Sequence, residues 1–342
     1  MKRGRAPGVR PFLSRSARSG GDSLDTSARN RKATAHKKRH GLTRAIVRDR
    51  YLYLMIAPAF LLVLLFSYIT LIGWGLAFTD YRLGQSFFNL NWVGFKQFQA
   101  FLVEGSDLGY LMTNTLVINI VSLFTNIICA MAFAILLNEL RSKRFPKTVQ
   151  TISFFPFFIS WIIVYSMANA LFAVSSGSIN MLMVKLGLIK RGINILGDEV
   201  YAWQLVILLS LWKTLGYNGV IFMAAISGIS AEEYEAAEID GANRWHKVRF
   251  ITLPNIMPTA LVLLIMNSGW ILNSNFDLFY VFTNSTNWPR MEVLDMYIYK
   301  YGLRMGNYPY SIAVGMMKTV VSLTLLMIVN QVSRRVSERS IL

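Results

Sequence analysis

The sequence is poor in the residue types that form metal, redox and nucleophilic centres. Its 342 residues include one cysteine, Cys129, which leaves no pair for a disulfide framework or a dithiol redox centre. The three histidines, at positions 36, 40 and 246, are too scattered for a metal site. The phosphate-cradling pattern G-x-x-x-x-G-K-S/T is missing as well, so the sequence predicts no nucleotide site. We therefore expect neither a catalytic nor a metal site, and no enzyme activity, in this chain.

Charged residues are also scarce. They make up 15% of the chain, against about 25% in soluble domains, whereas hydrophobic residues make up 54%. Lys and Arg number 35 against 18 Asp and Glu, but 15 of the basic residues and 3 of the acidic ones lie in residues 1–50. The rest of the chain is apolar and only mildly charged. This distribution indicates a membrane protein and argues against a nucleic-acid-binding domain.

Residues 1–50 are rich in Arg and Ser, and no hydrophobic segment of a secretory signal precedes Tyr51. Blocks of like charge repel one another and stay solvated, so we expect a basic, disordered cytoplasmic tail over residues 1–50. Residues 51–335 would then form the transmembrane domain. A basic tail module that binds membrane surfaces or nucleic acid is the alternative, and deletion of residues 1–45 would distinguish the two.

Six apolar runs are long enough to cross about 30 Å of hydrocarbon, which takes roughly 20 helical residues. Their continuous apolarity predicts helices, because the strands of a membrane barrel would alternate in polarity. The fold class expected is therefore an all-α membrane protein. Its six transmembrane helices are predicted at 51–78, 111–137, 149–173, 202–226, 256–281 and 310–332.

The Lys and Arg residues between these runs predict an orientation. With the tail in the cytoplasm, the inner segments hold 25 basic residues and the outer loops hold 8. The basic turn at 141–144 supports this orientation independently of the long tail. The positive-inside rule then places both the N-terminus and the C-terminus in the cytoplasm.

The inner loop between the fourth and fifth runs, residues 228–254, is long enough to have structure of its own. Ser230 and Glu233 have the spacing of a capping box, which predicts the start of a helix. Gly241 predicts its end, because a residue at positive φ after a helix is usually glycine. A second short helix is expected directly after this turn. The loop would be a helix–turn–helix at the cytoplasmic face.

The same loop carries the pattern EAA-x3-G-x9-I-x-L-P. Its fixed positions are filled by Glu235, Ala236, Ala237, Gly241, Ile251, Leu253 and Pro254. This string resembles the EAA loop of permease subunits of binding-protein-dependent ABC importers. The resemblance implies that residues 228–254 form a coupling loop, which docks in a groove of a nucleotide-binding subunit. Glu235 would make a polar contact there, and Gly241 would make the turn.

Three further segments, 176–187, 313–315 and 330–335, are similar to the sugar branch of that family, in particular to permeases for oligosaccharides and polysaccharides. The resemblance implies a type I ABC importer permease fold in the bacterial cell membrane, with lipid around it. It also implies a second permease subunit that is commonly a different chain, an extracytoplasmic solute-binding protein, and two ATPase subunits that bind ATP-Mg. No cofactor would belong to this chain.

Uncharged polar and aromatic side chains inside the runs are candidates for the substrate path, because sugars offer hydroxyls to amides and apolar faces to aromatic rings. The expected path residues are Trp270, Asn273, Asn267 and Asn275 in the fifth run, Trp161, Tyr165 and Asn169 in the third, and Asn218 in the fourth. Interhelical hydrogen bonds and interfacial aromatic belts are the alternative roles of such residues. Asp277 and Lys318 are charged candidates, and no partner for Lys318 is evident from the sequence.

Other transporters were weighed against this interpretation. A peptide or amino-acid importer would share the EAA loop, but the runs hold no charged cluster, which favours a neutral ligand. A uronate oligomer stays open, with Lys318 or Lys213 as its counter-charge. A secondary transporter usually needs intramembrane acids for its coupling ion, and the runs hold almost none. An intramembrane enzyme would need paired carboxylates or a Ser–His arrangement that these runs lack.

Overall fold

The computed structural model describes residues 48–86, 90–105, 107–140, 142 and 144–337, except for the side chains of residues 104 and 332–337. Of the tail expected over residues 1–50, all but the last three residues lie outside the described part. The chain divides into two compact units, residues 1–72 and 73–342.

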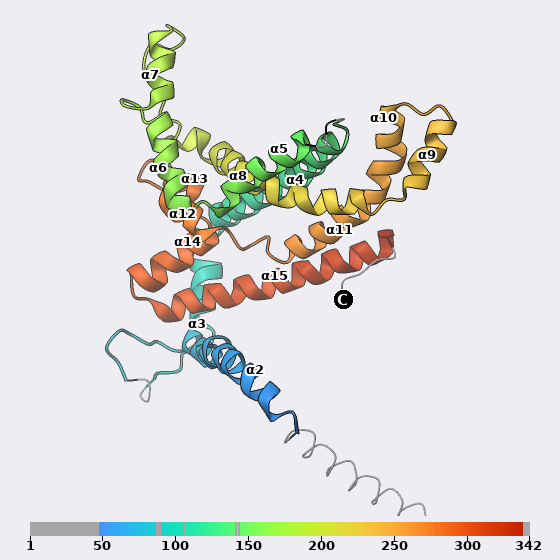
Figure 1. Cartoon of the computed structure of the whole chain (residues 1–342). Coiled ribbons are helices and arrows are strands. Elements are labelled where there is room, and N and C mark those ends of the chain that lie inside the picture. Colours follow the sequence, from blue (N-terminus) through green and yellow to red (C-terminus); the bar gives the residue numbers. More distant parts are fainter. Residues whose placement is uncertain (1–47, 87–89, 106, 141, 143, 338–342) are drawn as a thin grey trace, which may run out of the picture. The chain divides into compact units, whose positions relative to one another are not determined.

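Within the described residues the secondary structure is helical, apart from one isolated bridge between Thr79 and Trp92. The α-helices, labelled in Figure 1, are α2 (Arg50–Val63), α3 (Lys96–Gln99), α4 (Leu108–Asn138), α5 (Phe145–Phe154), α6 (Trp161–Phe172), α7 (Ser178–Lys185), α8 (Ala202–Ser227), α9 (Ala231–Ile239), α10 (Arg244–Lys247), α11 (Leu253–Ser268), α12 (Phe276–Phe282), α13 (Trp288–Met291), α14 (Leu294–Tyr299) and α15 (Tyr308–Ser337). Shorter 3-10 segments are Ile69–Phe78, Phe155–Phe158 and Glu199–Tyr201, and π-helical turns are Leu64–Tyr68, Ala100–Glu104, Val248–Thr252 and Lys300–Arg304.

Five helical segments of the described chain are long and apolar enough to cross a membrane: Arg50–Phe78, Leu108–Asn138, Glu199–Ser227, Arg244–Ser268 and Tyr308–Gln331. A sixth is formed by Phe145–Phe158 and Trp161–Phe172, which meet at an angle of 104°. With this bent pair counted as one span, the number is the six that the sequence predicts. The first of these segments is apolar along its length, as α2 within it shows, which is typical of a helix that crosses a membrane.

The third span is not the straight helix predicted over 149–173. Its backbone leaves the helical conformation at Ile159, which is extended. The buried ammonium of Lys213 donates hydrogen bonds to the carbonyls of Pro156 (3.2 Å), Phe157 (3.1 Å) and Ile159. The Pro156 carbonyl also accepts from the N–H of Ile159 at 3.1 Å, so Lys213 chiefly satisfies the carbonyls of Phe157 and Ile159, at the negative end of a helix dipole. Lys213 is therefore a structural cap for the bend, and its donors are already occupied.

The fifth span also differs from the predicted 256–281. The helix is continuous from Arg244 to Ser268, because the π-helical turn Val248–Thr252 leads directly into α11. It then ends, and residues 269–275 form a non-helical stretch before α12 begins. Asn275 caps α12 by accepting a hydrogen bond from the N–H of Leu278 at 3.3 Å. Short polar side chains such as Asn compete for backbone hydrogen bonds and so favour caps over helix interiors.

Glycines on α8 allow it to pack closely against α5 and α4 (Figure 1). A Cβ on Gly216 would lie 2.1 Å from the carbonyl oxygen of Ser153 in α5. A Cβ on Gly219 would lie 2.7 Å from the ring of Phe133 in α4. This close packing lets polar side chains of α4 and α8 meet across the interface.

Candidate functional site

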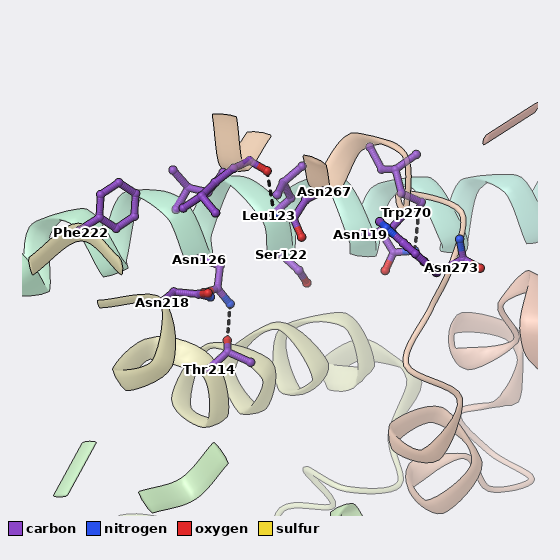
Figure 2. A pocket seen from close by; sticks show the side chains of 13 residues that line it. Asn119, Ser122, Leu123, Asn126, Thr214, Asn218, Phe222, Asn267, Trp270 and Asn273 are labelled. Atoms are coloured by element: carbon purple, nitrogen blue, oxygen red, sulfur yellow. Dashed lines mark hydrogen bonds between the residues drawn. The ribbon is translucent and has the colours of Figure 1, made fainter. Parts of the chain in front are cut away.

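A polar cavity of about 270 Å³ lies between α4, α8 and the end of α11 (Figure 2). Its lining comprises Asn119, Ser122, Leu123, Asn126, Ile127, Thr214, Asn218, Phe222, Leu263, Asn267, Trp270, Ile271 and Asn273. None of these lining residues carries a charge. The cavity therefore presents amides, hydroxyls and an indole, which together donate and accept hydrogen bonds without an ionic group.

Helical spacing brings the polar lining onto one face of each helix. On α4, Asn119, Ser122 and Asn126 recur at intervals of three and four residues, and on α8 Thr214 and Asn218 are four residues apart. Residues at these intervals share a face of an α-helix. Because α4 and α8 pack side by side, the two polar faces border the same space.

Short hydrogen bonds join these two faces. The Asn218 Nδ2 donates to Asn126 Oδ1 at 2.6 Å, and Asn126 Nδ2 donates to Thr214 Oγ1 at 2.6 Å. Figure 2 shows Asn126 and Thr214 facing one another across the gap between their helices. Thr214 in turn donates to the carbonyl of Ser210 at 2.7 Å. The network fixes the orientation of the amides that a ligand would meet.

The non-helical stretch 269–275 carries two exposed side chains of the cavity. Trp270 is 69% exposed and Asn273 is also exposed, and neither side chain forms a hydrogen bond with the rest of the described chain. The stretch itself is held in place, because Asn119 Nδ2 donates to the carbonyl of Ile271 at 2.8 Å and to Ser274 Oγ at 3.0 Å. Uncommitted side chains on a fixed backbone are suited to binding a ligand.

An ion pair holds the same stretch from another helix. The ammonium of Lys318 in α15 pairs with Asp295 Oδ1, and Asp295 Oδ2 accepts a hydrogen bond from the N–H of Ser274 at 2.7 Å. The two charged side chains are 10% and 20% exposed. Lys318 therefore has a partner, which the sequence had placed in an outer loop.

Four of the eight expected path residues line the cavity, namely Trp270, Asn273, Asn267 and Asn218. The other four lie elsewhere. Asn275 caps α12, and Trp161 is buried with its ring 5.2 Å from the Lys213 ammonium. Tyr165 and Asn169 line a separate cavity of about 330 Å³. Asp277, in the first turn of α12, is exposed.

Sequence reasoning missed the lining residues Asn119, Ser122, Asn126 and Thr214. A signal was present on α4, because Asn119, Ser122 and Asn126 share one face of an otherwise apolar helix. Thr214 gave a weaker signal, because it shares a face of α8 with Asn218 but forms only one such interval.

The predicted helix in the loop after α8 is present as α9. Ser230 caps it by accepting a hydrogen bond from the N–H of Glu232 at 3.2 Å. A capping box also needs the carboxylate of Glu233 to accept a hydrogen bond from the N–H of Ser230. This part of the prediction is wrong, because the Glu233 carboxylate accepts a hydrogen bond from Asn255 Nδ2 at 3.0 Å instead. This partner lies at the start of α11, 22 residues along the chain, which local spacing cannot reveal.

Gly241 ends α9, as the sequence predicts. Its φ is +78°, a conformation that L side chains adopt at a cost. The N–H groups of Gly241 and Ala242 donate to the carbonyls of Glu238 (3.0 Å) and Ala237 (2.8 Å). This pair of hydrogen bonds is a Schellman motif, which satisfies carbonyls at the helix end.

Side-chain contacts fasten α9 to the helix that follows it. The hydroxyls of Tyr234 and Thr252 are 2.9 Å apart, and Lys247 forms an ion pair with Glu238. The hydrogen bond from Lys247, together with its charge, lowers the pKa of the Glu238 carboxyl. Since Thr252 is fully buried and leads into α11, the loop is a stiff extension of the fifth span.

The residues of the EAA pattern differ in exposure. Glu235, Ala236, Gly241 and Pro254 are exposed, whereas Ala237, Ile251 and Leu253 are half-buried. Glu235 forms no hydrogen bond or ion pair with another described residue. Beside it, the loop exposes three large apolar side chains, with Ile239 87%, Trp245 67% and Phe250 67% exposed. An exposed apolar surface of this kind is typical of a protein interface.

Comparisons with known proteins place this geometry in a family. The family described as binding-protein-dependent transport system inner membrane component matches residues 126–338, more than half of the chain. Protein LplB of Bacillus subtilis is 35% identical over 297 residues, which cover 87% of this chain and 92% of LplB. The polygalacturonan/rhamnogalacturonan transport system permease protein YteP of the same organism is 38% identical over 305 residues, or 89% of this chain and 94% of YteP.

A solved structure shares the fold. In the crystal structure of a bacterial ABC transporter involved in the import of the acidic polysaccharide alginate, one chain matches with a TM-score of 0.78 and 31% identity. The match covers 86% of this chain and 99% of that one. The EAA loop and the helical fold agree with these likenesses, and the expected ABC importer permease fold is confirmed. The chain belongs to the family of binding-protein-dependent transport system inner membrane components.

Proposed function

We propose that this chain is the permease subunit of an ATP-driven importer that carries an oligosaccharide across the bacterial cell membrane. The observation that carries the proposal is the uncharged cavity between α4, α8 and α11 in a chain of this family. Amides and hydroxyls of the lining match the hydroxyls of a sugar, and the exposed indole of Trp270 offers a surface for the apolar face of a sugar ring.

The similar proteins support a sugar over an amino acid or peptide. YteP is named for polygalacturonan and rhamnogalacturonan, and the structural match is an importer of alginate, so both relatives handle polysaccharides. An amino acid or a peptide would carry charged termini at neutral pH. The cavity lining holds no charged side chain to pair with them, and an unpaired charge away from water is costly.

The loop that contains α9 is proposed to couple the permease to two ATPase subunits. Its surface combines an uncommitted carboxylate, Glu235, with exposed Ile239, Trp245 and Phe250. The contacts of Tyr234 and Lys247 make it stiff, so movement of the ATPases would reach α11 and the stretch that carries Trp270. ATP-Mg would bind to those subunits, and both termini of this chain would lie on their side of the membrane.

A second permease subunit and an extracytoplasmic solute-binding protein complete the proposal. Trp270 is 69% exposed at the rim of the cavity, so another subunit is needed to enclose a path around it. By resemblance to the family, that subunit is a different chain. A related crystal structure holds the alginate importer in complex with a periplasmic protein bound to an alginate pentasaccharide, with a TM-score of 0.78 at 31% identity.

Reconstitution tests the proposed function. The chain is incorporated into proteoliposomes with its partner permease and ATPases, and the uptake of labelled oligosaccharides is measured with the binding protein outside. Uptake should require both ATP inside and the binding protein outside. Uptake driven by an ion gradient without ATP would contradict the importer, and transport of a peptide but of no sugar would contradict the substrate class.

A further inference from the structure

A second cavity of about 250 Å³ borders the non-helical stretch 269–275 on the side of α15. It is lined by Gly269, Trp270, Asn273, Lys318, Thr319, Ser322, Leu323 and Leu326. Trp270 and Asn273 line both this cavity and the uncharged one. A chain molecule bound at Trp270 could therefore extend from one cavity into the other.

The hydroxyl of Ser322 is, within the described chain, an unpartnered polar group in the lining of this second cavity. Ser322 is 8% exposed, and its Oγ has no hydrogen-bond partner among the described residues. Other hydroxyls of α15 behave differently, because Thr319 and Thr324 donate to the carbonyls of Gly315 and Val320. A buried polar group without a partner is unfavourable, and in native structures a ligand or water usually satisfies it.

Lys318 adds uncommitted donors one turn before Ser322. An ammonium has three N–H donors, and the only partner of Lys318 in the described chain is Asp295. Both oxygens of Asp295 are in use, one by Lys318 and the other by the N–H of Ser274. Lys318 lines the cavity and Asp295 does not, so the cavity meets the positive end of the pair.

We propose that Lys318 and Ser322 form a subsite for the carboxylate of a uronate unit, so that the importer carries an acidic oligosaccharide. This inference rests on the proposed function. The Lys318 ammonium can only donate, and the Ser322 hydroxyl can donate as well as accept, so one acceptor group can satisfy both side chains. An ionised carboxylate is an acceptor-only group with two oxygens, and a charged donor forms the stronger hydrogen bonds with it. The neutral remainder of the chain would occupy the uncharged cavity.

The test uses the assembled importer in proteoliposomes and two probes of equal length, a trisaccharide of two galactose units and one galacturonate unit, and the methyl ester of that galacturonate. The ester keeps the sugar rings and their free hydroxyls and removes the charge. Uptake is measured with wild type, Lys318→Arg, the double variant Lys318→Gln/Asp295→Asn, and Ser322→Ala. Thr324→Ala is the matched control, because it removes an exposed hydroxyl from the same helix. The same binding protein delivers the probes to every variant, so its own preference cancels in each comparison with wild type.

The wild type should take up the acid. The double variant should raise the KM for the acid by about tenfold or more, with little change for the ester, because it removes a charge-assisted hydrogen bond without leaving a buried charge unpaired. Lys318→Arg should stay near wild type. Ser322→Ala should raise the KM for the acid roughly two- to tenfold without lowering the Tm, because the hydroxyl has no partner to lose in the empty protein. Thr324→Ala should change neither the KM for the acid nor the Tm.

Several results would overturn the subsite. The first is that the wild type takes up the ester but not the acid. The second is that the KM for the acid is unchanged in the double variant. The third is that Ser322→Ala leaves this KM unchanged and lowers the Tm. If the double variant does not assemble, the KM of Ser322→Ala decides alone. Uptake of neutral sugars only would reject the acidic substrate and leave the proposed function standing. An importer that carries no sugar at all would reject both.

Discussion

The carboxylate of Asp295 accepts a hydrogen bond of 2.7 Å from the backbone N–H of Ser274. The same carboxylate pairs with Lys318 of α15, and on the α4 side Asn119 binds the carbonyl of Ile271. The non-helical stretch 269–275 is therefore held by contacts with α4, α14 and α15. These attachments fix the backbone that carries Trp270, so the position of a candidate substrate contact depends on an ion pair in other helices.

Removal of Asp295 should destabilise the protein strongly. Asp295→Ala leaves the largely buried ammonium of Lys318 without its partner, and breaking a buried pair in this way costs about 3–5 kcal/mol. Adding Lys318→Met removes the unpaired charge and should restore part of the lost stability. Thermal unfolding of the purified importer in detergent measures the stability of Asp295→Ala, Lys318→Met and the double variant. If the double variant loses as much stability as the two single variants added together, the pair is not coupled.

Two glycines of α8 should differ in their tolerance of alanine. At Gly216 a Cβ meets the backbone oxygen of Ser153 at 2.1 Å, so Gly216→Ala must separate α8 from α5 and should cost about 1–3 kcal/mol or more. At Gly219 the nearest atoms belong to the side chain of Phe133, which can move, and alanine gains about 1 kcal/mol of helix propensity. Gly219→Ala should therefore have little effect on the Tm. Equal losses for the two variants would contradict the packing described for α8.

Replacement of Lys213 should disrupt the bend of the third span. Lys213→Met leaves the carbonyls of Phe157 and Ile159 without the donor that Lys213 supplies, whereas Pro156 keeps the N–H of Ile159. Each buried unpaired group costs about 1–3 kcal/mol. We expect a large drop in Tm and in the yield of assembled importer. Lys185→Met is the control, because Lys185 is exposed in α7 and has no such role. Similar stability of the two variants would mean that the bend does not depend on the ammonium.

Substitution of Gly241 should uncouple ATP hydrolysis from transport while assembly is largely kept. Proline cannot adopt φ +78° and removes the N–H that binds the carbonyl of Glu238, so Gly241→Pro destroys the turn. Gly241→Ala meets no atom within 4 Å and carries only the backbone strain, about 1–2 kcal/mol. The readouts are sugar uptake and the stimulation of ATPase activity by the loaded binding protein. Gly228→Ala, at an ordinary φ of −85°, is the control, and wild-type uptake by Gly241→Pro would refute the proposed role of the turn.

Local signals were sufficient to predict the loop between α8 and α11. Ser230 and Gly241 act on backbone groups within a few residues, so a helix start and a helix end can be inferred from the sequence alone. The partner of Glu233 could not be predicted, because Asn255 is 22 residues away and meets it only after α9 folds back on α11.

The breaks in the third and fifth spans depend on distant groups. Lys213 binds Pro156 across 57 residues, and Asp295 binds Ser274 across 21. Hydropathy detects that a segment is apolar and long enough to span, but it contains no information on which donor can satisfy an interrupted backbone. The cavity shows the same limit, since Asn126 and Thr214 become neighbours only when α4 packs on α8.

The most direct test of the account is the effect of Trp270 and Asn273 on sugar transport. In reconstituted vesicles, Trp270→Ala and Asn273→Ala should each raise the KM for oligosaccharide uptake roughly tenfold, which corresponds to about 1.4 kcal/mol of lost contact. Trp270→Phe keeps an aromatic face and should lose less. Both residues are exposed, so the Tm should stay near wild type. If neither alanine substitution changes uptake or sugar-stimulated ATP hydrolysis, the cavity beside this stretch is not the substrate path.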